Sequence, residues 1–419
     1  MTTHKGFLKA GHLPTLVAAL LYFDVSFMVW VLLGPLAPFL REQFALTATQ
    51  QGLLVAVPLL GGSLFRPVLG ILGDRIGGRR AGLLALGLTV TPLVIGSQLA
   101  HTAAQLYAVG FLLGIAGASF AVALPLASGW YPPEYQGLAM GIAGAGNSGS
   151  LLATLAAPRL AERFGWATTF GLMILPVLLV FILFAALAKD SPRRRVKSTW
   201  HDYTAVLKER DTIWFSFLYS LTFGGFVGFT SFLPTFFRDQ YHVSRVAAGD
   251  FTTIVVVAGS LLRPVGGWLS DRVGGYRLLL MVLVAVSGCL LSAATLPSLS
   301  VVVAVLFVAV GLLGMGNGAV FQLVPQRFAD RMGLVTGIVG AAGGLGGFFL
   351  PSVLGATRDV TGTYRMGLTW CAGAFLIGAL VLLELGARWN ARWQPHAAKQ
   401  AGIFCYRGVV RGLLGQETA

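Results

Sequence analysis

The sequence predicts an all-α, polytopic membrane protein with twelve transmembrane helices in two halves of six. Of its 419 residues, 56% are hydrophobic by a broad count and 11% are charged, and the mean hydropathy is +0.77. A soluble domain has about 25% charged residues, so this chain cannot cover itself with a solvated surface. Several uncharged windows reach the roughly 20 residues that cross a hydrocarbon core about 30 Å thick. Most of the protein is therefore expected to face the lipid bilayer.

Each expected span is an apolar run bounded by polar or charged residues. The spans cover residues 13–40, 50–72, 80–99, 104–129, 137–161, 168–188, 212–237, 247–269, 277–296, 299–325, 333–356 and 366–386. The longest polar connection, 189–211, separates six spans from six, and its composition predicts a cytoplasmic linker with a short surface helix after Ser198. The chain therefore divides into an N-terminal half (1–188), this linker, a C-terminal half (212–386) and a basic cytoplasmic tail (387–419).

The placement of lysine and arginine predicts the orientation, because cytoplasmic loops carry an excess of both. With the N-terminus inside, most of the 30 basic residues fall in loops and tails of the cytoplasmic side. The basic residues of the opposite side are Arg41, Arg159, Arg163, Arg238, Arg245, Arg358 and Arg365. We expect a multi-pass protein of the cytoplasmic (inner) membrane with both termini in the cytoplasm. The first span lacks a small-residue cleavage site, so it is not expected to be a signal peptide.

The composition also excludes several classes of function. The net charge of +14 does not indicate nucleic-acid binding, because the charges lie in short segments between apolar runs. The cysteines (Cys289, Cys371 and Cys405) have neither C-x-x-C spacing nor metal-ligating neighbours, so no disulfide framework or metal site is expected. No H-E-x-x-H motif, Ser/His/Asp set or nucleotide-binding loop is present. We expect no cofactor and no enzymatic activity.

The two halves repeat each other in sequence. The segment 22–44 aligns with 219–241, and "GDRIGGRR" at 73–80 aligns with "SDRVGGYR" at 270–277, both displaced by 197 positions. "GLAMGIAGAGNSG" at 137–149 resembles "GLVTGIVGAAGGL" at 333–345. Because six spans are an even number, the halves share one orientation. A parallel repeat of this kind places a substrate site near the bilayer midplane, between the halves.

One arginine of each half lies within a membrane span. Arg66, in "GSLFRP", and Arg263, in "GSLLRP", occupy equivalent positions of spans 2 and 8. An arginine at the bilayer centre costs roughly 2.5–3.5 kcal/mol unless it faces the interior of the bundle or a partner. A structural ion pair is the alternative to an anion site. Only one acid, Asp24, is clearly within the core, and it cannot neutralise both arginines. The planar guanidinium suits a small planar oxyanion, which it can bind through two oxygens at once.

These motifs carry a resemblance to a known family. The string "ILGDRIGGRR" and its copy resemble the cytoplasmic gating motif of the major facilitator superfamily. "AGAGNSG" at 143–149, "GAAGGLGGFFLP" at 340–351 and the two arginines together resemble the nitrate/nitrite porters. The resemblance implies the major facilitator fold and secondary active transport of nitrate, nitrite or both by alternating access. A porter for another small anion or for an organic acid is the alternative. We expect a monomer in the bilayer.

The resemblance also implies roles for individual residues. It places the substrate beside Arg66 and Arg263, with Phe120, Tyr219 and Phe223 lining the site. Asn147 either donates to the anion or bonds a neighbouring helix, and the resemblance favours the anion. The glycines of spans 5 and 11, which allow close helix packing, are Gly141, Gly144, Gly146, Gly149, Gly337, Gly340, Gly343, Gly344, Gly346 and Gly347. The expected cytoplasmic gate consists of Asp74, Arg75, Arg79, Asp271 and Arg272.

Asp24 is the candidate for proton coupling. It lies near the middle of span 1, and its counterpart in the repeat is Leu221. Either it forms an ion pair with one of the arginines, or it binds and releases a proton during transport. Entry of an anion against an inside-negative potential costs about 2.3 kcal/mol per 100 mV, so uptake has to be driven. The resemblance implies that both coupling modes occur in the family and that the exchanging type lacks a membrane-embedded acid. Asp24 therefore favours proton-coupled nitrate import, and nitrate/nitrite exchange is the alternative.

Overall fold

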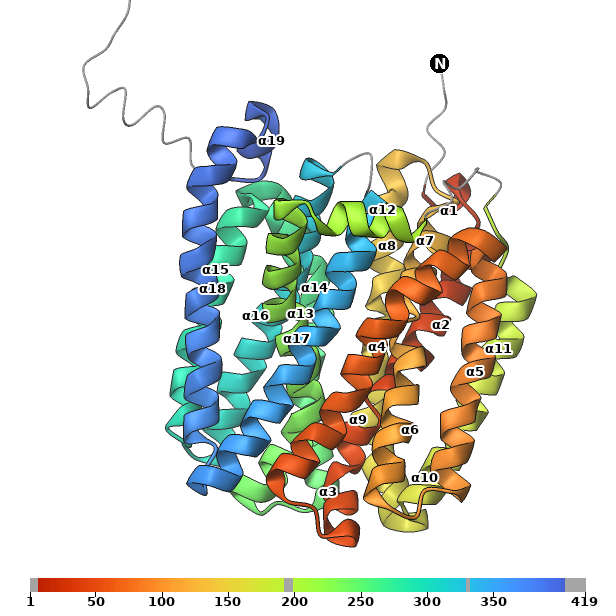
Figure 1. Cartoon of the computed structure of the whole chain (residues 1–419), viewed down its shortest axis with the longest axis vertical. Coiled ribbons are helices and arrows are strands. Elements are labelled where there is room, and N and C mark those ends of the chain that lie inside the picture. Colours follow the sequence, from red (N-terminus) through yellow and green to blue (C-terminus); the bar gives the residue numbers. More distant parts are fainter. Residues whose placement is uncertain (1–6, 192–198, 329–331, 404–419) are drawn as a thin grey trace, which may run out of the picture.

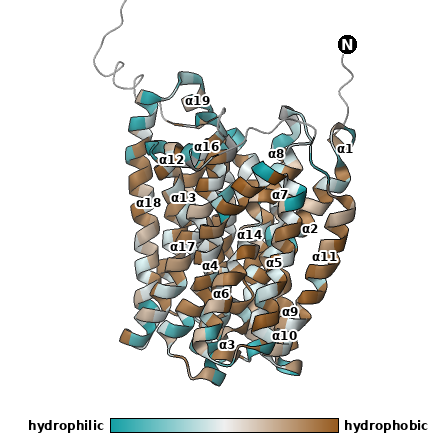
Figure 2. Ribbon diagram, turned by 45° about the vertical axis from the view of Figure 1, so that its right-hand side comes forward, coloured by the Kyte–Doolittle hydropathy of each residue, from teal (hydrophilic) through white to brown (hydrophobic). Residues whose placement is uncertain are grey.

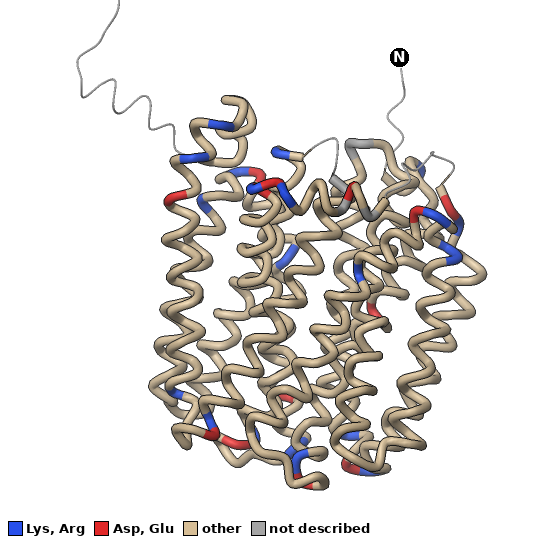
Figure 3. Tube along the Cα trace, in the orientation of Figure 1, with Lys and Arg blue, Asp and Glu red and all other residues tan. Residues whose placement is uncertain are grey.

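The computed structural model describes residues 7–191, 199–328 and 332–403 as a bundle of long helices. The N-terminal half and the C-terminal half stand side by side, with most helices along the vertical axis in Figure 1. Eleven helices in this part of the chain are long and apolar enough to cross a membrane. Apolar residues cover the length of these helices in Figure 2, and charged residues gather at the two ends of the bundle in Figure 3.

The remaining span, the fifth, is divided into three pieces. It consists of α8 (Pro133–Gly144), the 3-10 turn η1 (Ala145–Ser148) and α9 (Gly149–Phe164). A 3-10 stretch within a helix often marks a hinge or a functional position. With this span the predicted count of twelve is confirmed, whereas the interruption at residues 145–148 was not foreseen.

Three other spans are built from two consecutive helices. The first contains α2 (Leu13–Trp30) and α3 (Leu33–Phe44), and the fourth contains α6 (Ala103–Gly117) and α7 (Phe120–Ser128). The sixth contains α10 (Trp166–Leu172) and α11 (Ile174–Leu187). The breaks in the first and fourth spans fall beside Trp30 and Phe120, two aromatic residues of the site described below.

The remaining helices complete both halves. They are α1 (Phe7–Ala10), α4 (Ala48–Ile76), α5 (Gly78–Gln98), α12 (Trp200–Leu207), α13 (Arg210–Tyr241), α14 (Arg245–Val273), α15 (Gly275–Ala294), α16 (Leu299–Arg327), α17 (Met332–Thr361), α18 (Arg365–Arg392) and α19 (Pro395–Gln400). The short helix expected after Ser198 corresponds to α12. The last span continues beyond the predicted end at residue 386, and residues 404–419 of the predicted tail lie outside the described part.

The two ends of the bundle can be distinguished by their short helices. α1, α12 and α19 lie together at one end, at the top of Figure 1, which we call the inner end. The opposite end, with α3 and α10, is called the outer end. The excess of lysine and arginine predicts that the inner end faces the cytoplasm.

The two halves meet along a few helix pairs. α4 packs against α17, α3 against α13, and α9 against α14. Glycines make these crossings close: a Cβ on Gly52 of α4 would collide with the backbone of Pro351 on α17, and one on Gly249 would lie 2.6 Å from the carbonyl oxygen of Thr154. Because small residues let helix backbones approach each other, these crossings hold the halves in direct contact around the site.

Candidate functional site

Arg66 is buried between the two halves and keeps part of its guanidinium unpaired. It lies on α4 and is 1% exposed. Its Nε donates to the carbonyl oxygen of Gly117 at 3.1 Å, and its Nη1 donates to the carbonyl oxygen of Gly340 in the other half. Its Nη2 has no hydrogen-bond partner among the described residues. Two carbonyl dipoles fix the orientation of the side chain without neutralising its charge.

Three aromatic rings surround the Arg66 guanidinium. Its Cζ lies 5.2 Å from the ring centroid of Trp30 and 5.4 Å from those of Phe120 and Phe223. Trp30 is held in place because its Nε1 donates to the carbonyl oxygen of Pro58 at 2.7 Å. The negative faces of aromatic rings attract a cation and exclude water. The arginine is thus kept charged in a dry environment, where an anion would be attracted strongly.

Arg263 approaches the same region from α14 with fewer contacts. Its Cζ lies 5.9 Å from the ring centroid of Phe321, and its Nη1 has no hydrogen-bond partner in the part of the chain that the structure describes. A Cβ on Gly144, in the opposite half, would lie 3.9 Å from this Cζ. The guanidinium groups of Arg66 and Arg263 lie close enough to repel each other. An anion placed between them would remove this repulsion.

The three aromatic residues predicted from the resemblance do lie together. Tyr219 and Phe223 stack with 5.1 Å between ring centroids and 7° between ring planes. Phe321 joins this group, since its centroid lies 4.8 Å from that of Tyr219 and 6.0 Å from that of Phe120. Neither Phe321 nor Trp30 was identified from the sequence. Phe321 lies on the span that the repeat pairs with the span of Phe120, but at the offset of 197 its counterpart is Leu124, so the repeat gave no signal for it.

Asn147 lies on the 3-10 turn η1 and is 1% exposed. Within the described residues, neither its amide nitrogen nor its amide oxygen has a hydrogen-bond partner. The hydrogen bond to a neighbouring helix, which the sequence left open, is therefore absent from this structure. The adjacent Gly146 packs against α2, where an added Cβ would lie 2.9 Å from the Cβ of Phe23. The amide is free to bind a ligand.

Asp24 is bonded to the same 3-10 turn. Its Oδ1 accepts a hydrogen bond from the hydroxyl of Ser148 at 2.6 Å, and it forms no ion pair with an arginine of the described chain. Of the two roles that the sequence allowed for Asp24, an ion pair with an arginine and proton binding, the ion pair is not found among the described residues. Ser148 directly follows Asn147, so the carboxyl group and the free amide are joined through one short turn.

Most glycines of the two signatures face a neighbouring helix. A Cβ on Gly340 would lie 3.3 Å from Phe120 and 3.6 Å from Nη1 of Arg66, and one on Gly343 would lie 2.7 Å from Tyr219. Added Cβ atoms on Gly149, Gly344, Gly346 and Gly347 would also meet atoms of neighbouring helices. Gly337 lies on α17 near its start. The expectation is wrong for Gly141, which is exposed and has nothing within 4 Å of an added Cβ.

The predicted gate residues lie at the inner end, and those with recorded contacts use partners of their own half. Arg79 donates from Nη2 to the carbonyl oxygen of Ala185 at 2.7 Å, and its backbone nitrogen donates to Asp190 at 3.0 Å. The Cζ of Arg272 lies 3.9 Å from the ring centroid of Trp268 on the same helix. Asp74, Arg75 and Asp271 form no ion pair with any described residue. Their role as a gate stays a prediction.

The outer end, by contrast, is crossed by ion pairs between the halves. Arg41 pairs with Asp239, and Arg159 binds both carboxylate oxygens of Asp250, at 2.7 and 3.0 Å. Further pairs join Arg238 to Glu42 at 3.4 Å, and Arg245 to Glu42 at 3.2 Å and to Glu162 at 3.4 Å. We call these eight residues the outer ion-pair cluster. The sequence placed their arginines on this side but did not show their partners.

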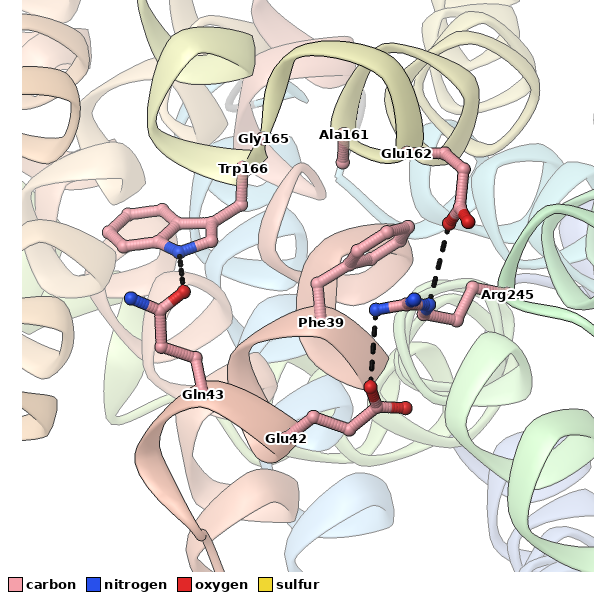
Figure 4. Close-up of a pocket in the computed structure, with 8 residues that line it drawn as sticks. All are labelled: Phe39, Glu42, Gln43, Ala161, Glu162, Gly165, Trp166 and Arg245. Atoms are coloured by element: carbon pink, nitrogen blue, oxygen red, sulfur yellow. Dashed lines mark hydrogen bonds and ion pairs between the residues drawn. The ribbon is translucent and has the colours of Figure 1, made fainter.

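Arg245 is the most enclosed cation of the outer ion-pair cluster. It reaches from α14 into a cleft of about 490 Å³ between α3 and α9, where it lies between Glu42 and Glu162 (Figure 4). Its Cζ lies 4.5 Å from the ring centroid of Phe39. Two acids and one aromatic ring of the N-terminal half therefore hold one arginine of the C-terminal half.

The outer closure also uses the start of α4. The carboxylate of Asp359, on α17, accepts hydrogen bonds from the backbone nitrogens of Ala48 at 3.0 Å and Thr49 at 2.7 Å. A carboxylate is favoured at the positive end of a helix dipole. Nearby, Gln51 donates to the hydroxyl of Thr235 at 2.9 Å.

The fold and the site together define a class of protein. Two repeated six-helix halves enclose a buried, cationic site, and contacts between the halves close one end of the bundle. This is the organisation of a secondary transporter of the membrane, in which the halves move around a site near the midplane.

The family follows from comparison with known proteins. The family model of the Major Facilitator Superfamily matches residues 18–351. The chain is 38% identical over 375 residues to the probable nitrate/nitrite transporter NarK2 of Mycobacterium tuberculosis (strain ATCC 25618 / H37Rv), covering 88% of this chain and 95% of that protein. It is 35% identical over 385 residues to the nitrite extrusion protein of Bacillus subtilis (strain 168), covering 90% and 94%. The chain belongs to the major facilitator superfamily and, within it, to the family of these nitrate/nitrite transporters.

A solved structure supports the fold. The xylose transporter XylE of E. coli, in a partially occluded inward-open conformation, matches with a TM-score of 0.72. Sequence identity is 16%, and the match covers 89% of this chain and 98% of that chain. At this identity the likeness concerns the arrangement of the helices alone.

Proposed function

We propose that the protein transports nitrate, nitrite or both across the cytoplasmic membrane by alternating access. The observation that carries this proposal is the pair of arginines, Arg66 and Arg263, which converge from opposite halves with guanidinium nitrogens unpaired. Two relatives at 35% and 38% identity are named for nitrate or nitrite transport, which favours these anions among small oxyanions.

The binding chemistry follows from the geometry of the side chains. A trigonal or bent oxyanion between the arginines would accept hydrogen bonds from Nη2 of Arg66 and Nη1 of Arg263, with Asn147 as a further donor. Charge-assisted hydrogen bonds of this kind are roughly twice as strong as neutral ones. The stacked rings of Tyr219 and Phe223 would exclude water from the bound anion.

Alternating access assigns a role to the outer ion-pair cluster. Because these pairs join the two halves at the outer end, an anion can enter from outside only after they separate. The halves would rock about the midplane, with the glycine-lined crossings allowing the helices to slide. The inner gate residues would form contacts between the halves in the opposite, outward-open state.

Proton coupling would proceed through Asp24. The carboxylate accepts a hydrogen bond from Ser148, which follows the anion-binding Asn147. Protonation of Asp24 removes its charge and weakens this bond, so the position of η1 would depend on the proton. Nitrate entry carries a charge against the membrane potential, at about 2.3 kcal/mol per 100 mV, and import needs more than one proton per nitrate to exploit that potential. One further proton carrier would then be required.

Nitrate/nitrite exchange is the second candidate for coupling. It is favoured by the relative from Bacillus subtilis, whose name assigns it to nitrite extrusion. Exchange of one monovalent anion for another moves no net charge. The two arginines suffice for this mode, and Asp24 would then act only on the position of η1.

Transport by the purified protein in liposomes tests the function and separates the two modes. Nitrate uptake is measured by ion chromatography into vesicles that contain either nitrite or an inert buffer, each with and without an inward proton gradient. Acceleration by the proton gradient without internal nitrite supports symport. Acceleration by internal nitrite alone establishes exchange and removes the symport proposal.

The substrate assignment has its own test in the same vesicles. Unlabelled nitrate and nitrite should compete with labelled nitrate, whereas formate and acetate at the same concentration should not. No nitrate uptake in any of the four conditions, from a protein that elutes as one folded species, would contradict the proposed function. Equal competition by formate or acetate would favour the organic-acid alternative.

A further inference from the structure

Asn317 is a second buried amide without partners, in the C-terminal half. It lies on α16 and is 1% exposed, and within residues 7–191, 199–328 and 332–403 neither its nitrogen nor its oxygen has a hydrogen-bond partner. Burying an amide without hydrogen bonds is unfavourable, and most buried side-chain polar atoms in native structures are paired. The chain contains only two other asparagines, Asn147 and Asn390. An unpaired amide at this depth requires an explanation.

The neighbours of Asn317 place it beside the anion site. Phe321 follows it by four residues, so the two side chains share one face of α16. The ring of Phe321 lies 4.8 Å from that of Tyr219 and 5.9 Å from Cζ of Arg263. Asn317 therefore lies one helical turn from a residue that contacts both the aromatic wall and the second arginine.

The glycines on either side of Asn317 confirm which helices enclose it. A Cβ on Gly316 would lie 2.9 Å from Cγ2 of Thr222 on α13, and one on Gly318 would lie 2.7 Å from the carbonyl oxygen of Arg263 on α14. Thr222 is itself fully buried, and its hydroxyl has no hydrogen-bond partner in the described structure. The amide is thus packed between the two helices that carry Tyr219 and Arg263, in a region where polar atoms remain unpaired.

A count of donors gives this amide a function. Nitrate has three oxygens and nitrite has two. In the proposed site, Arg66 and Arg263 each retain an unpaired nitrogen, and Asn147 adds an amide from the N-terminal half. The two arginines can bind two of these oxygens. With the amide of Asn317, the C-terminal half as well as the N-terminal half would have a donor for the third oxygen, which nitrite lacks.

We propose that Asn317 is a further anion-binding residue, which donates from its amide nitrogen to the third oxygen of a trigonal oxyanion and favours nitrate over nitrite. The inference rests on the proposed function and deepens it. Both asparagines then belong to one site, and each half supplies one arginine and one amide. The N-terminal half adds Phe120, and the C-terminal half adds Phe223 and Phe321. The arrangement is symmetric in chemistry although the asparagines do not occupy equivalent positions of the repeat.

Three variants in the full-length protein, reconstituted in liposomes, test this role. Asn317→Leu keeps the branching and the number of side-chain heavy atoms and removes the donor, and Asn317→Ser removes volume but keeps one hydroxyl donor. Asn390, which is half-buried on α18, provides the matched control, Asn390→Leu. For Asn317→Leu we expect a rise of about tenfold in the KM for nitrate, the effect of one lost hydrogen bond. We expect Vmax to change less than twofold, and the KM for nitrite to rise less than threefold.

The order of the variants separates binding from packing. If the amide is a donor, Asn317→Ser raises the nitrate KM less than Asn317→Leu does. If it only fills space, serine leaves a cavity and is the more damaging change, in transport and in melting temperature. That reversed order, an unchanged nitrate KM in a folded Asn317→Leu protein, or equal shifts for nitrate and nitrite would overturn the inference. These results are read against wild-type nitrate uptake, whose absence would instead contradict the proposed function.

Discussion

The two arginines occupy equivalent positions in the repeat, yet the structure holds them differently. Arg66 is fully buried, contacts three rings and donates to carbonyl oxygens of both halves. Arg263 is half-buried, lies over the ring of Phe321 and beside Tyr219, and reaches toward the opposite half at Gly144. One cation is fixed by its surroundings, whereas the other is held more loosely. We infer that Arg66 forms the fixed part of the site and that Arg263 moves onto the anion as the halves close.

Substitution by lysine should produce the largest effect and should differ between the two positions. Lysine keeps a positive charge, but its three donors share one nitrogen, so at position 66 it cannot reproduce the separate positions of Nε, Nη1 and Nη2 that face two carbonyl oxygens and the anion. We expect Arg66→Lys to lower the initial rate of nitrate uptake more than 100-fold, and Arg263→Lys about tenfold. Both rates are measured in liposomes at equal protein content.

Arg163, which is exposed at the outer end, provides the matched control for these lysine variants. Arg163→Lys should transport at the wild-type rate. Equal losses at positions 66 and 263 would show that the two arginines act alike, and the distinction between a fixed and a mobile cation would be abandoned.

The N-terminal half carries Asp24, whereas the equivalent position of the C-terminal half is Leu221, so the pH dependence of transport should depend on the N-terminal half. Asp24→Asn is expected to lower proton-driven nitrate accumulation about tenfold, because asparagine cannot bind and release a proton, while exchange against internal nitrite partly survives. Ser148→Ala keeps the carboxyl group and removes its hydrogen bond, so it should give an intermediate loss. The accumulation ratio is measured at several external pH values. A pH dependence that Asp24→Asn leaves unchanged would remove this residue from the coupling mechanism.

Among the glycines of the fifth and eleventh spans, a crowded position and an open one can be compared, and we expect a moderate effect on nitrate uptake at the crowded one. An alanine at Gly343 would place a methyl group 2.7 Å from the Tyr219 ring, so the stacked rings would have to shift. We expect Gly343→Ala to reduce nitrate uptake about fivefold. Gly141→Ala, where nothing lies within 4 Å, should transport within twofold of wild type. Similar losses in both variants would mean that glycine matters in these spans through helix flexibility rather than through close contacts.

The smallest effect is expected for an exposed member of the outer ion-pair cluster. A surface ion pair contributes about 0–1 kcal/mol, so Arg159→Gln should change the transport rate less than threefold. Arg159→Asp alone and Asp250→Arg alone each place two like charges opposite each other, so each should lower the transport rate. The double variant, which has both changes, should restore the wild-type transport rate. The double-mutant cycle measures the coupling between the halves at this point. Additive effects would show that the pair does not contribute to closure.

The sequence revealed the parts of the molecule that depend on local composition or on the repeat. The spans follow from apolar length, and Arg66 and Arg263 stand out because a charge inside the membrane is costly. Phe321, Trp30 and Asn317 could not be chosen in this way. There are 28 phenylalanines in the chain, and only the packing of helices distant in sequence selects the few that face the arginines.

The outer ion-pair cluster shows a second limit of sequence reasoning. Loop charges such as Arg245 and Glu162 report on orientation, but their pairing depends on how α9 and α14 meet. The interruption at Ala145–Ser148 was also missed, since glycines within an apolar run fit a continuous helix equally well. Each of these features depends on tertiary contacts that no local pattern contains.

The partial exposure of the outer ion-pair cluster has a consequence for the cell's surroundings. The side chains of Arg159 and Asp250 are 47% and 38% exposed, so dissolved ions reach them. At physiological ionic strength the screening length is about 8 Å, and it falls to about 3 Å at 1 M. Brackish or saline growth media would therefore weaken the closure on the outer side while leaving the buried arginines unscreened. Higher salinity would then shift the protein toward states that are open to the outside.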